Sequence, residues 1–122
     1  MKHAELTNKI LECCFEVMNE LGVGFLESVY EKSLLVALRQ KGLIAKSQFP
    51  MEVEFRGETV GEFYADIFVE DRIIVELKVS KSLAPQHSAQ VINYLKATGC
   101  EVGLLINFGK PKIEYKRLYF AQ

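Results

Sequence analysis

The spacing of apolar residues changes near Gln48, and this change constrains the fold more than any other feature of the sequence. Before it, apolar residues recur every three or four positions, which is typical of helices packed on one side. After it, Met51, Val53 and Phe55 alternate with charged residues, which is typical of a half-exposed strand. The pattern therefore predicts helices first and a sheet after them.

Three helices are predicted from their apolar stripes and end signals. They cover residues 6–21, 26–38 and 85–98. A glycine follows each helix within a few positions, and a proline opens the third, as is typical of helix ends and starts. We therefore expect two helices before the sheet and one inserted between its strands.

Strands fill most of the remaining chain, and the run 73–79 is apolar enough to be central in the sheet. The expected strands cover residues 48–56, 59–69, 73–79, 102–108 and, as an edge strand or a tail, 114–120. This order predicts an α/β fold, an α-β-α sandwich with a central mixed β-sheet. The 122 residues fit a single domain, residues 1–122.

Charge and cysteine content narrow the function classes. A net charge of −1 leaves no excess of basic residues, which argues against a general DNA-coating protein but not against an enzyme with local basic groups. Three cysteines are too few and too badly spaced for a disulfide framework or a four-cysteine metal site. No apolar stretch suits a signal peptide or a membrane span, so we expect a cytoplasmic protein without a membrane partner.

Two carboxylates and an amine stand out in the predicted strands. Nine residues separate Asp66 from Glu76, the length that a tight strand-turn-strand connection needs to place them side by side. Lys78 lies two residues beyond Glu76, and alternate residues of a strand share a face. We expect the carboxylates within about 5 Å of each other, close enough to share a hard cation such as Mg²⁺. With Lys78 beside it, such a cation would serve phosphodiester hydrolysis.

A Glu-x-Lys tripeptide alone is weak evidence, because residues 114–116 match it equally well. That copy has no aspartate on an adjacent strand and lies in a half-polar segment, where such residues usually form a solvated face. Glu76 and Lys78 lie instead in an apolar strand, where an unpaired charge is costly. The alternative interpretation is a structural ion-pair network of these residues with Asp66 at the end of the sheet.

The motifs around these residues resemble a known family. Asp66, followed after nine residues by 76–78, is similar to the motif of the PD-(D/E)XK nuclease superfamily, although Ala65 stands in place of the proline. In the third predicted helix, residues 90–94 resemble the Gln-x-x-x-Tyr element of its RecB-like branch. Upstream, residues 24–30 match the motif of the GxxExxY protein family, a set of small proteins in that superfamily.

The resemblance spans residues 21–109 and implies a restriction-endonuclease-like core with a nuclease site that uses Mg²⁺ or Mn²⁺. It implies that Asp66, Glu76 and Glu27 bind the metal and that Lys78 is the catalytic lysine. It also implies a nucleic-acid partner, DNA in preference to RNA. The residues expected to flank the site or contact nucleic acid are Gln90, Tyr94 and Tyr30.

The accessory residues also have plainer interpretations. Glu27 falls in the first turn of its helix, where any carboxylate is favoured by the helix dipole. Gln90, Tyr94 and His87 share one helix face, which can simply face solvent. Tyr30 and Tyr94 can stack on bases, but each lies beside an apolar stripe and can equally pack in the core.

Two function classes are consistent with the sequence. The first is a metal-dependent nuclease acting on DNA or RNA, which the intact Asp66, Glu76 and Lys78 favour. The second is a non-catalytic nucleic-acid-binding or regulatory module that retains the nuclease fold, which the short chain and the lack of a basic tail favour. A symmetric homodimer, formed through an exposed edge such as residues 114–120, is one way for so small a domain to gain binding surface.

Overall fold

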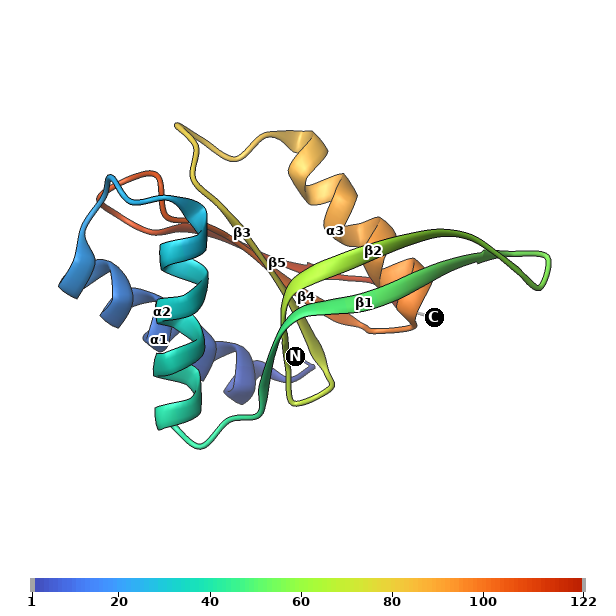
Figure 1. Ribbon diagram of the computed structural model, residues 1–122, viewed down its shortest axis with the longest axis horizontal. Coiled ribbons are helices and arrows are strands. Elements are labelled where there is room, and N and C mark those ends of the chain that lie inside the picture. Colours follow the sequence, from blue (N-terminus) through green and yellow to red (C-terminus); the bar gives the residue numbers. More distant parts are fainter. Residues whose placement is uncertain (1, 122) are drawn as a thin grey trace.

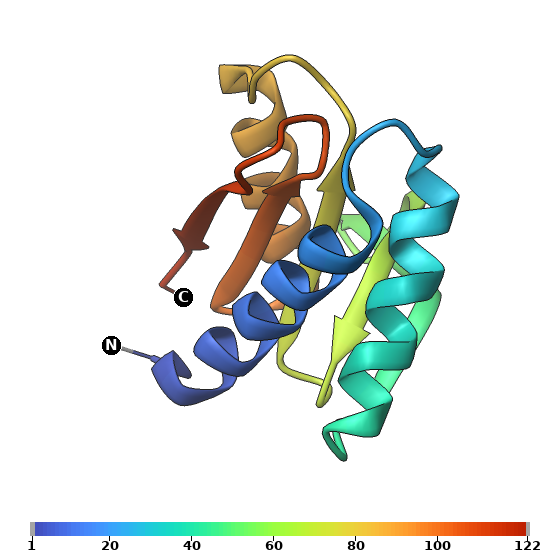
Figure 2. The same ribbon diagram turned by 90° about the vertical axis from the view of Figure 1, so that its left-hand side faces the viewer.

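The computed structural model describes residues 2–121 as a five-stranded sheet with helices on both faces (Figure 1). Helices α1 and α2 cover one face and α3 covers the other, as the view in Figure 2 also shows. The expected α-β-α sandwich with a mixed sheet is confirmed. The elements are α1 (Ala4–Leu21), α2 (Glu27–Gln40), β1 (Ala45–Phe55), β2 (Glu58–Val69), β3 (Ile73–Lys78), α3 (Pro85–Thr98), β4 (Val102–Asn107) and β5 (Glu114–Tyr119).

The sheet keeps the order of the sequence, β1-β2-β3-β4-β5, so β3 is its central strand as its apolar run predicted. Neighbouring strands are antiparallel except β3 and β4, which are parallel and joined by α3. A parallel pair needs such a crossover because the chain must return to the same end of the sheet. As a result, the loops that follow β3 and β4 lie at the same end of the molecule.

Two hydrophobic cores sandwich the sheet. The larger core lies under α1 and α2, where Tyr30, Leu34 and Leu38 recur every four residues of α2 and are fully buried. The smaller core lies under α3 and includes Ile74 and Leu95. Successive residues of β3 alternate between the two cores, so this strand is buried on both faces. None of the helices in residues 2–121 is long and apolar enough to cross a membrane.

The β1–β2 hairpin extends beyond the body of the sheet (Figure 1). Strand β2 pairs with β1 along most of its length but with β3 only at Ile67, Phe68 and Val69. The hairpin turns at Arg56 and Gly57, which both have positive φ, as the tight turns preferred in hairpins require. From Asp66 towards that turn, β2 has therefore left its neighbour β3.

Two predicted boundaries were wrong for local reasons. Strand β1 begins at Ala45 rather than at Gln48, because Gln48 adopts a φ of 48° and interrupts the alternation that revealed the strand. Leu26, expected in the apolar stripe of the second helix, is 76% exposed. It precedes the first residue of α2, and the buried stripe begins only at Tyr30.

Candidate active site

The candidate site lies where β2 separates from β3. The last residue pair between the two strands is Ile67 with Val75, and the next residues along them are Asp66 and Glu76. Here hydrogen bonds from the backbone to these two carboxylates replace the backbone hydrogen bonds of the strand ladder. The backbone amide of Asp66 donates to Oε1 of Glu76 at 3.1 Å, and the amide of Leu77 donates to Oδ2 of Asp66 at 2.8 Å. Each carboxylate is thus held by the backbone of the opposite strand.

Glu76 and Lys78 share the face of β3 that is turned towards α3. Ile74, two residues earlier, packs in the core under α3, whereas Leu77 packs in the core under α1 and α2. Because alternate residues of a strand share a face, Glu76 and Lys78 follow Ile74. The structure therefore brings both carboxylates and the lysine to one place.

Glu76 is buried, with 5% of its surface exposed. Burial raises its pKa from an ordinary value of 4.5 to about 8, and the nearby charge of Asp66 adds to the rise. A hydrogen bond between the two carboxyl groups contributes in the same direction, while the backbone of Asp66 and the charge of Lys78 oppose it. The pair therefore carries more negative charge than its surroundings accommodate, which favours a proton or a cation between the two groups.

Lys78 makes no ion pair shorter than 4.0 Å with any carboxylate in the described part of the chain. It is half-buried and close enough to lower the pKa of both Glu76 and Glu27. A structural ion-pair network, the alternative considered from the sequence, would place its amine directly against a carboxylate. Its amine is instead available to a further negatively charged group.

Glu27 approaches the site from the first residue of α2. Although the residue is exposed, loss of hydration raises its pKa, the charge of Asp66 raises it further and Lys78 lowers it. These influences require Glu27 to lie within electrostatic range of both residues. Its place in the first turn also suits the helix dipole, so the two interpretations of Glu27 are compatible.

Glu31 and Gln48 belong to the site but were missed in the sequence. Glu31 accepts hydrogen bonds from Ser47 Oγ at 3.1 Å and from Gln48 Nε2 at 3.0 Å. Gln48 Nε2 also lies 3.5 Å from Asp66 Oδ1. The signal for Glu31 was present, because it follows Glu27 by four residues and so shares its helix face. No sequence signal marked Gln48, whose role depends on its left-handed backbone.

Helix α3 contributes Tyr94, which stacks on Phe63 of β2 with ring centroids 3.8 Å apart. Burial raises the pKa of Tyr94, and the charges of Glu76 and Asp66 raise it further, so Tyr94 lies within electrostatic range of both carboxylates. Gln90 is exposed one turn earlier on α3, and its side chain forms no hydrogen bond within residues 2–121. His87 is half-buried and accepts a hydrogen bond from the backbone amide of Ala84 at 3.0 Å.

Tyr30 requires a correction. Its ring is fully buried and stacks on Phe108 with centroids 4.9 Å apart, so it has no free face for a base. Its hydroxyl donates to the carbonyl oxygen of Gly22 at 2.6 Å and lies 3.3 Å from the amide of Phe25. Tyr30 therefore fastens the loop before α2, which sets where Glu27 begins its helix.

The donors suit a hard divalent cation held by two carboxylates. In residues 2–121 no group of three or more acidic, histidine or cysteine side chains is arranged to hold a metal, so Glu27 does not complete a three-ligand cluster with Asp66 and Glu76. Mg²⁺ commonly binds one or two carboxylates and keeps several waters. The excess negative charge that raises the pKa of Glu76 fits such an ion.

An α/β domain with paired carboxylates and an unpaired lysine on neighbouring strands has the architecture of a nuclease-type domain. A family model described as the PD-(D/E)XK nuclease superfamily matches residues 4–118, and the chain belongs to that superfamily. PD-(D/E)XK nucleases generally use divalent metal ions. Among curated proteins, no sequence gives a significant match.

Two solved structures share the fold. The crystal structure of SSO0001 superimposes with a TM-score of 0.61 at 20% identity, covering 78% of this chain and 50% of that one. An alkaline exonuclease, LHK-Exo, from Laribacter hongkongensis superimposes with a TM-score of 0.57 at 12% identity, covering 99% of this chain and 72% of that one. The chain thus corresponds to half of the first protein and to most of the second.

Proposed function

We propose that this chain is a metal-dependent nuclease that hydrolyses phosphodiester bonds, in DNA in preference to RNA. The observation that carries the proposal is the pairing of Asp66 and Glu76 through each other's strands, with the unpaired amine of Lys78 beside them. Membership of the PD-(D/E)XK superfamily and the shared fold of LHK-Exo support it.

In this proposal each residue has a distinct task. Asp66 and Glu76 hold Mg²⁺ or Mn²⁺, which supplies positive charge and lowers the pKa of bound water. Lys78 donates hydrogen bonds to the phosphate oxygen on which charge develops. Glu27, the first residue of α2, would support binding of the ion from beside this pair, because within residues 2–121 it stands outside a three-carboxylate cluster. Glu31 and Gln48 hold Asp66 in place.

The finer assignment follows the motifs. We propose that the chain is a GxxExxY-type protein of the RecB-like branch, because Glu27 and Tyr94 both approach the carboxylates from the motifs at residues 24–30 and 90–94. Gln90 would then contact substrate from the exposed face of α3. The stacked Phe63 and Tyr94 would form the wall of the site on that side.

Cleavage of supercoiled plasmid and of single-stranded DNA and RNA oligonucleotides tests the proposal. With Mg²⁺ or Mn²⁺ the wild type should produce nicks or shortened strands, and EDTA should abolish them. Asp66→Ala and Lys78→Ala should be inactive although folded. If wild type and both variants behave alike, the chain is instead a non-catalytic nucleic-acid-binding or regulatory module that retains the nuclease fold.

A further inference from the structure

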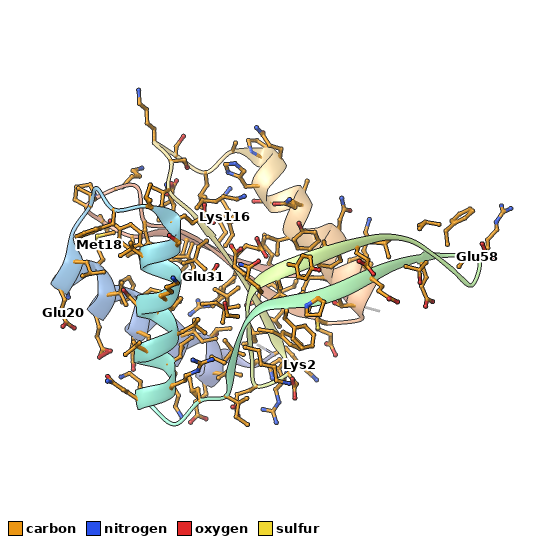
Figure 3. All side chains as sticks on the ribbon, in the orientation of Figure 1. Lys2, Met18, Glu20, Glu31, Glu58 and Lys116 are labelled. Carbon is orange, nitrogen blue, oxygen red and sulfur yellow. The ribbon has the colours of Figure 1, made fainter. Side chains whose placement is uncertain are left out.

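The net charge of −1 conceals an uneven distribution of charge around the candidate site. The loops that follow β3 and β4, residues 79–84 and 108–113, hold Lys81, Lys110 and Lys112 and no acidic residue, and Lys78 is the last residue of β3. The far part of the hairpin, residues 52–62, holds four glutamates and one arginine. Figure 3 shows one of these, Glu58, at the tip of the hairpin far from the body. A polyanion is therefore attracted to one side of the site and repelled from the other.

Buried Asn107 locks the two basic loops together. Its amide nitrogen donates to the carbonyl of Ser80 at 2.9 Å and to Glu114 at 3.2 Å. Its oxygen accepts from the amides of Ser80 at 3.0 Å and Gly109 at 2.9 Å. Every hydrogen-bonding group of this fully buried side chain is used, so the loops have a defined relative position.

Gly109 and Glu114 tighten the same junction. A Cβ at Gly109 would meet the backbone of Ser80, whose nitrogen would be only 2.5 Å away, so the loops touch there. Glu114 accepts a hydrogen bond from the amide of Leu83 at 3.0 Å and lies 3.9 Å from Lys110. Its hydrogen bond with Asn107 is the main reason why its pKa is lowered, so it stays ionised and keeps these contacts.

Helix α3 begins where the first of these loops ends, at Pro85. The positive end of its dipole therefore points towards the same end of the molecule as the lysines. We call Lys81, Lys110 and Lys112, together with this helix start, the lysine platform. The platform is continuous with Lys78, because the first loop starts from that residue and the backbone of Phe108 donates to its carbonyl at 2.8 Å.

We propose that the lysine platform binds the phosphates of a nucleic-acid strand whose scissile bond lies at Asp66 and Glu76. The proposal rests on the proposed function, to which it adds the path of the substrate. The strand runs over the ends of β3 and β4 and away from the acidic hairpin. Phosphate contacts carry no sequence information, so binding through the platform is independent of sequence.

Binding of a labelled oligonucleotide, followed by fluorescence anisotropy in EDTA so that no cleavage occurs, tests the platform. The test variant is Lys81→Ala/Lys112→Ala, which spares Lys110 because that residue also contacts Glu114. The matched control, Lys9→Ala/Lys46→Ala, removes the same charge at the opposite end of β3. There Lys46 bonds to Asp71, and Lys9 lines a cavity beside the turn between β2 and β3.

The platform variant should bind single-stranded DNA roughly tenfold more weakly at low salt. The slope of the logarithm of its binding constant against the logarithm of salt concentration should become shallower by about 0.7 for each lost phosphate contact. The control should stay within about twofold of wild type, because Lys9 pairs with Glu5 and Lys46 with Asp71, so neither amine is free for a phosphate. Circular dichroism and thermal melting of both variants establish that they are folded.

Equal losses in the platform variant and the control would overturn the proposal, because binding would then be diffuse. The proposal would also be overturned if polyglutamate competed for binding as effectively as DNA of equal charge, since the platform would then accept any polyanion. The two proposals fail separately. A wild type that binds through the platform but never cleaves refutes only the nuclease. A wild type that cleaves while the platform variant binds and cleaves normally refutes only the platform.

Discussion

Glu76 accepts a hydrogen bond from the backbone amide of Asp66 at 3.1 Å, at the position where the next pair of the β2–β3 ladder would otherwise form. This bond fixes one carboxylate and, through Leu77, the geometry of the other. The separation of β2 from β3 therefore both opens the sheet and orders the acidic pair. The site is a consequence of how the hairpin leaves the sheet.

The buried pair predicts a specific dependence of stability on pH. The folded state holds the Glu76 proton up to a pH of about 8, whereas the unfolded chain releases it near 4.5. The wild type should therefore lose stability as pH rises between these values, by about 1.4 kcal/mol for each unit of pKa difference. Glu76→Gln cannot ionise and should not show this loss.

Urea unfolding of wild type and Glu76→Gln at several pH values between 5 and 9 measures the difference. As pH rises, the free energy of unfolding of wild type should fall relative to that of the variant. Mg²⁺ should restore the stability of wild type at high pH and should stabilise the variant less. Parallel pH profiles for the two proteins would show that burial of Glu76 does not control its ionisation.

The role of Glu27 can be separated from its favourable place in the helix dipole. Loss of a dipole interaction costs about 0.3–1 kcal/mol of stability and nothing else. If Glu27 acts on the metal site, Glu27→Gln should lower the cleavage rate about tenfold or more and raise the Mg²⁺ concentration needed for half-maximal rate. Glu5→Gln, a first-turn acid of α1 remote from the site, is the control. A Glu27→Gln enzyme with wild-type kinetics would leave only the dipole role.

Gly109 should tolerate no side chain. An added Cβ would collide with the Ser80 backbone, which the Asn107 hydrogen bonds hold in place, so Gly109→Ala should cost about 1–3 kcal/mol of stability. Gly61→Ala is the matched control, because its Cβ would meet only Val53, at an ordinary 3.9 Å. Equal melting temperatures for Gly109→Ala and wild type would mean that the two basic loops are not locked together.

Much of the fold was predictable because apolar spacing reports burial directly. The apolar run of β3 and the nine residues between Asp66 and Glu76 were enough to place the carboxylates together. The stop at Gly22 and the start at Pro85 were equally visible, since each reflects a local backbone requirement. These features depend on neighbours in sequence, which is why a single sequence carries them.

Other features depend on tertiary contacts and left no local signal. The left-handed backbone of Gln48 hid the start of β1 and gave no hint of its contact with Asp66. In the sequence, Tyr30 suits the core and base stacking equally well. Only the tertiary structure shows that Phe108, far along the chain, stacks on its ring. The lysines at 78–84 and 108–113 gather only because β3 and β4 are parallel neighbours, a pairing that no short motif encodes.

The single-turnover rate of DNA cleavage in Mg²⁺, compared among wild type, Lys78→Ala and Lys46→Ala, tests the central claim most directly. Both variants lose one lysine, but only Lys78 lies beside Asp66 and Glu76, whereas Lys46 pairs with Asp71 at the other end of β3. We predict a loss of about 100-fold or more for Lys78→Ala and a near wild-type rate for Lys46→Ala. Cleavage by Lys78→Ala at the wild-type rate would contradict a nuclease site at these residues.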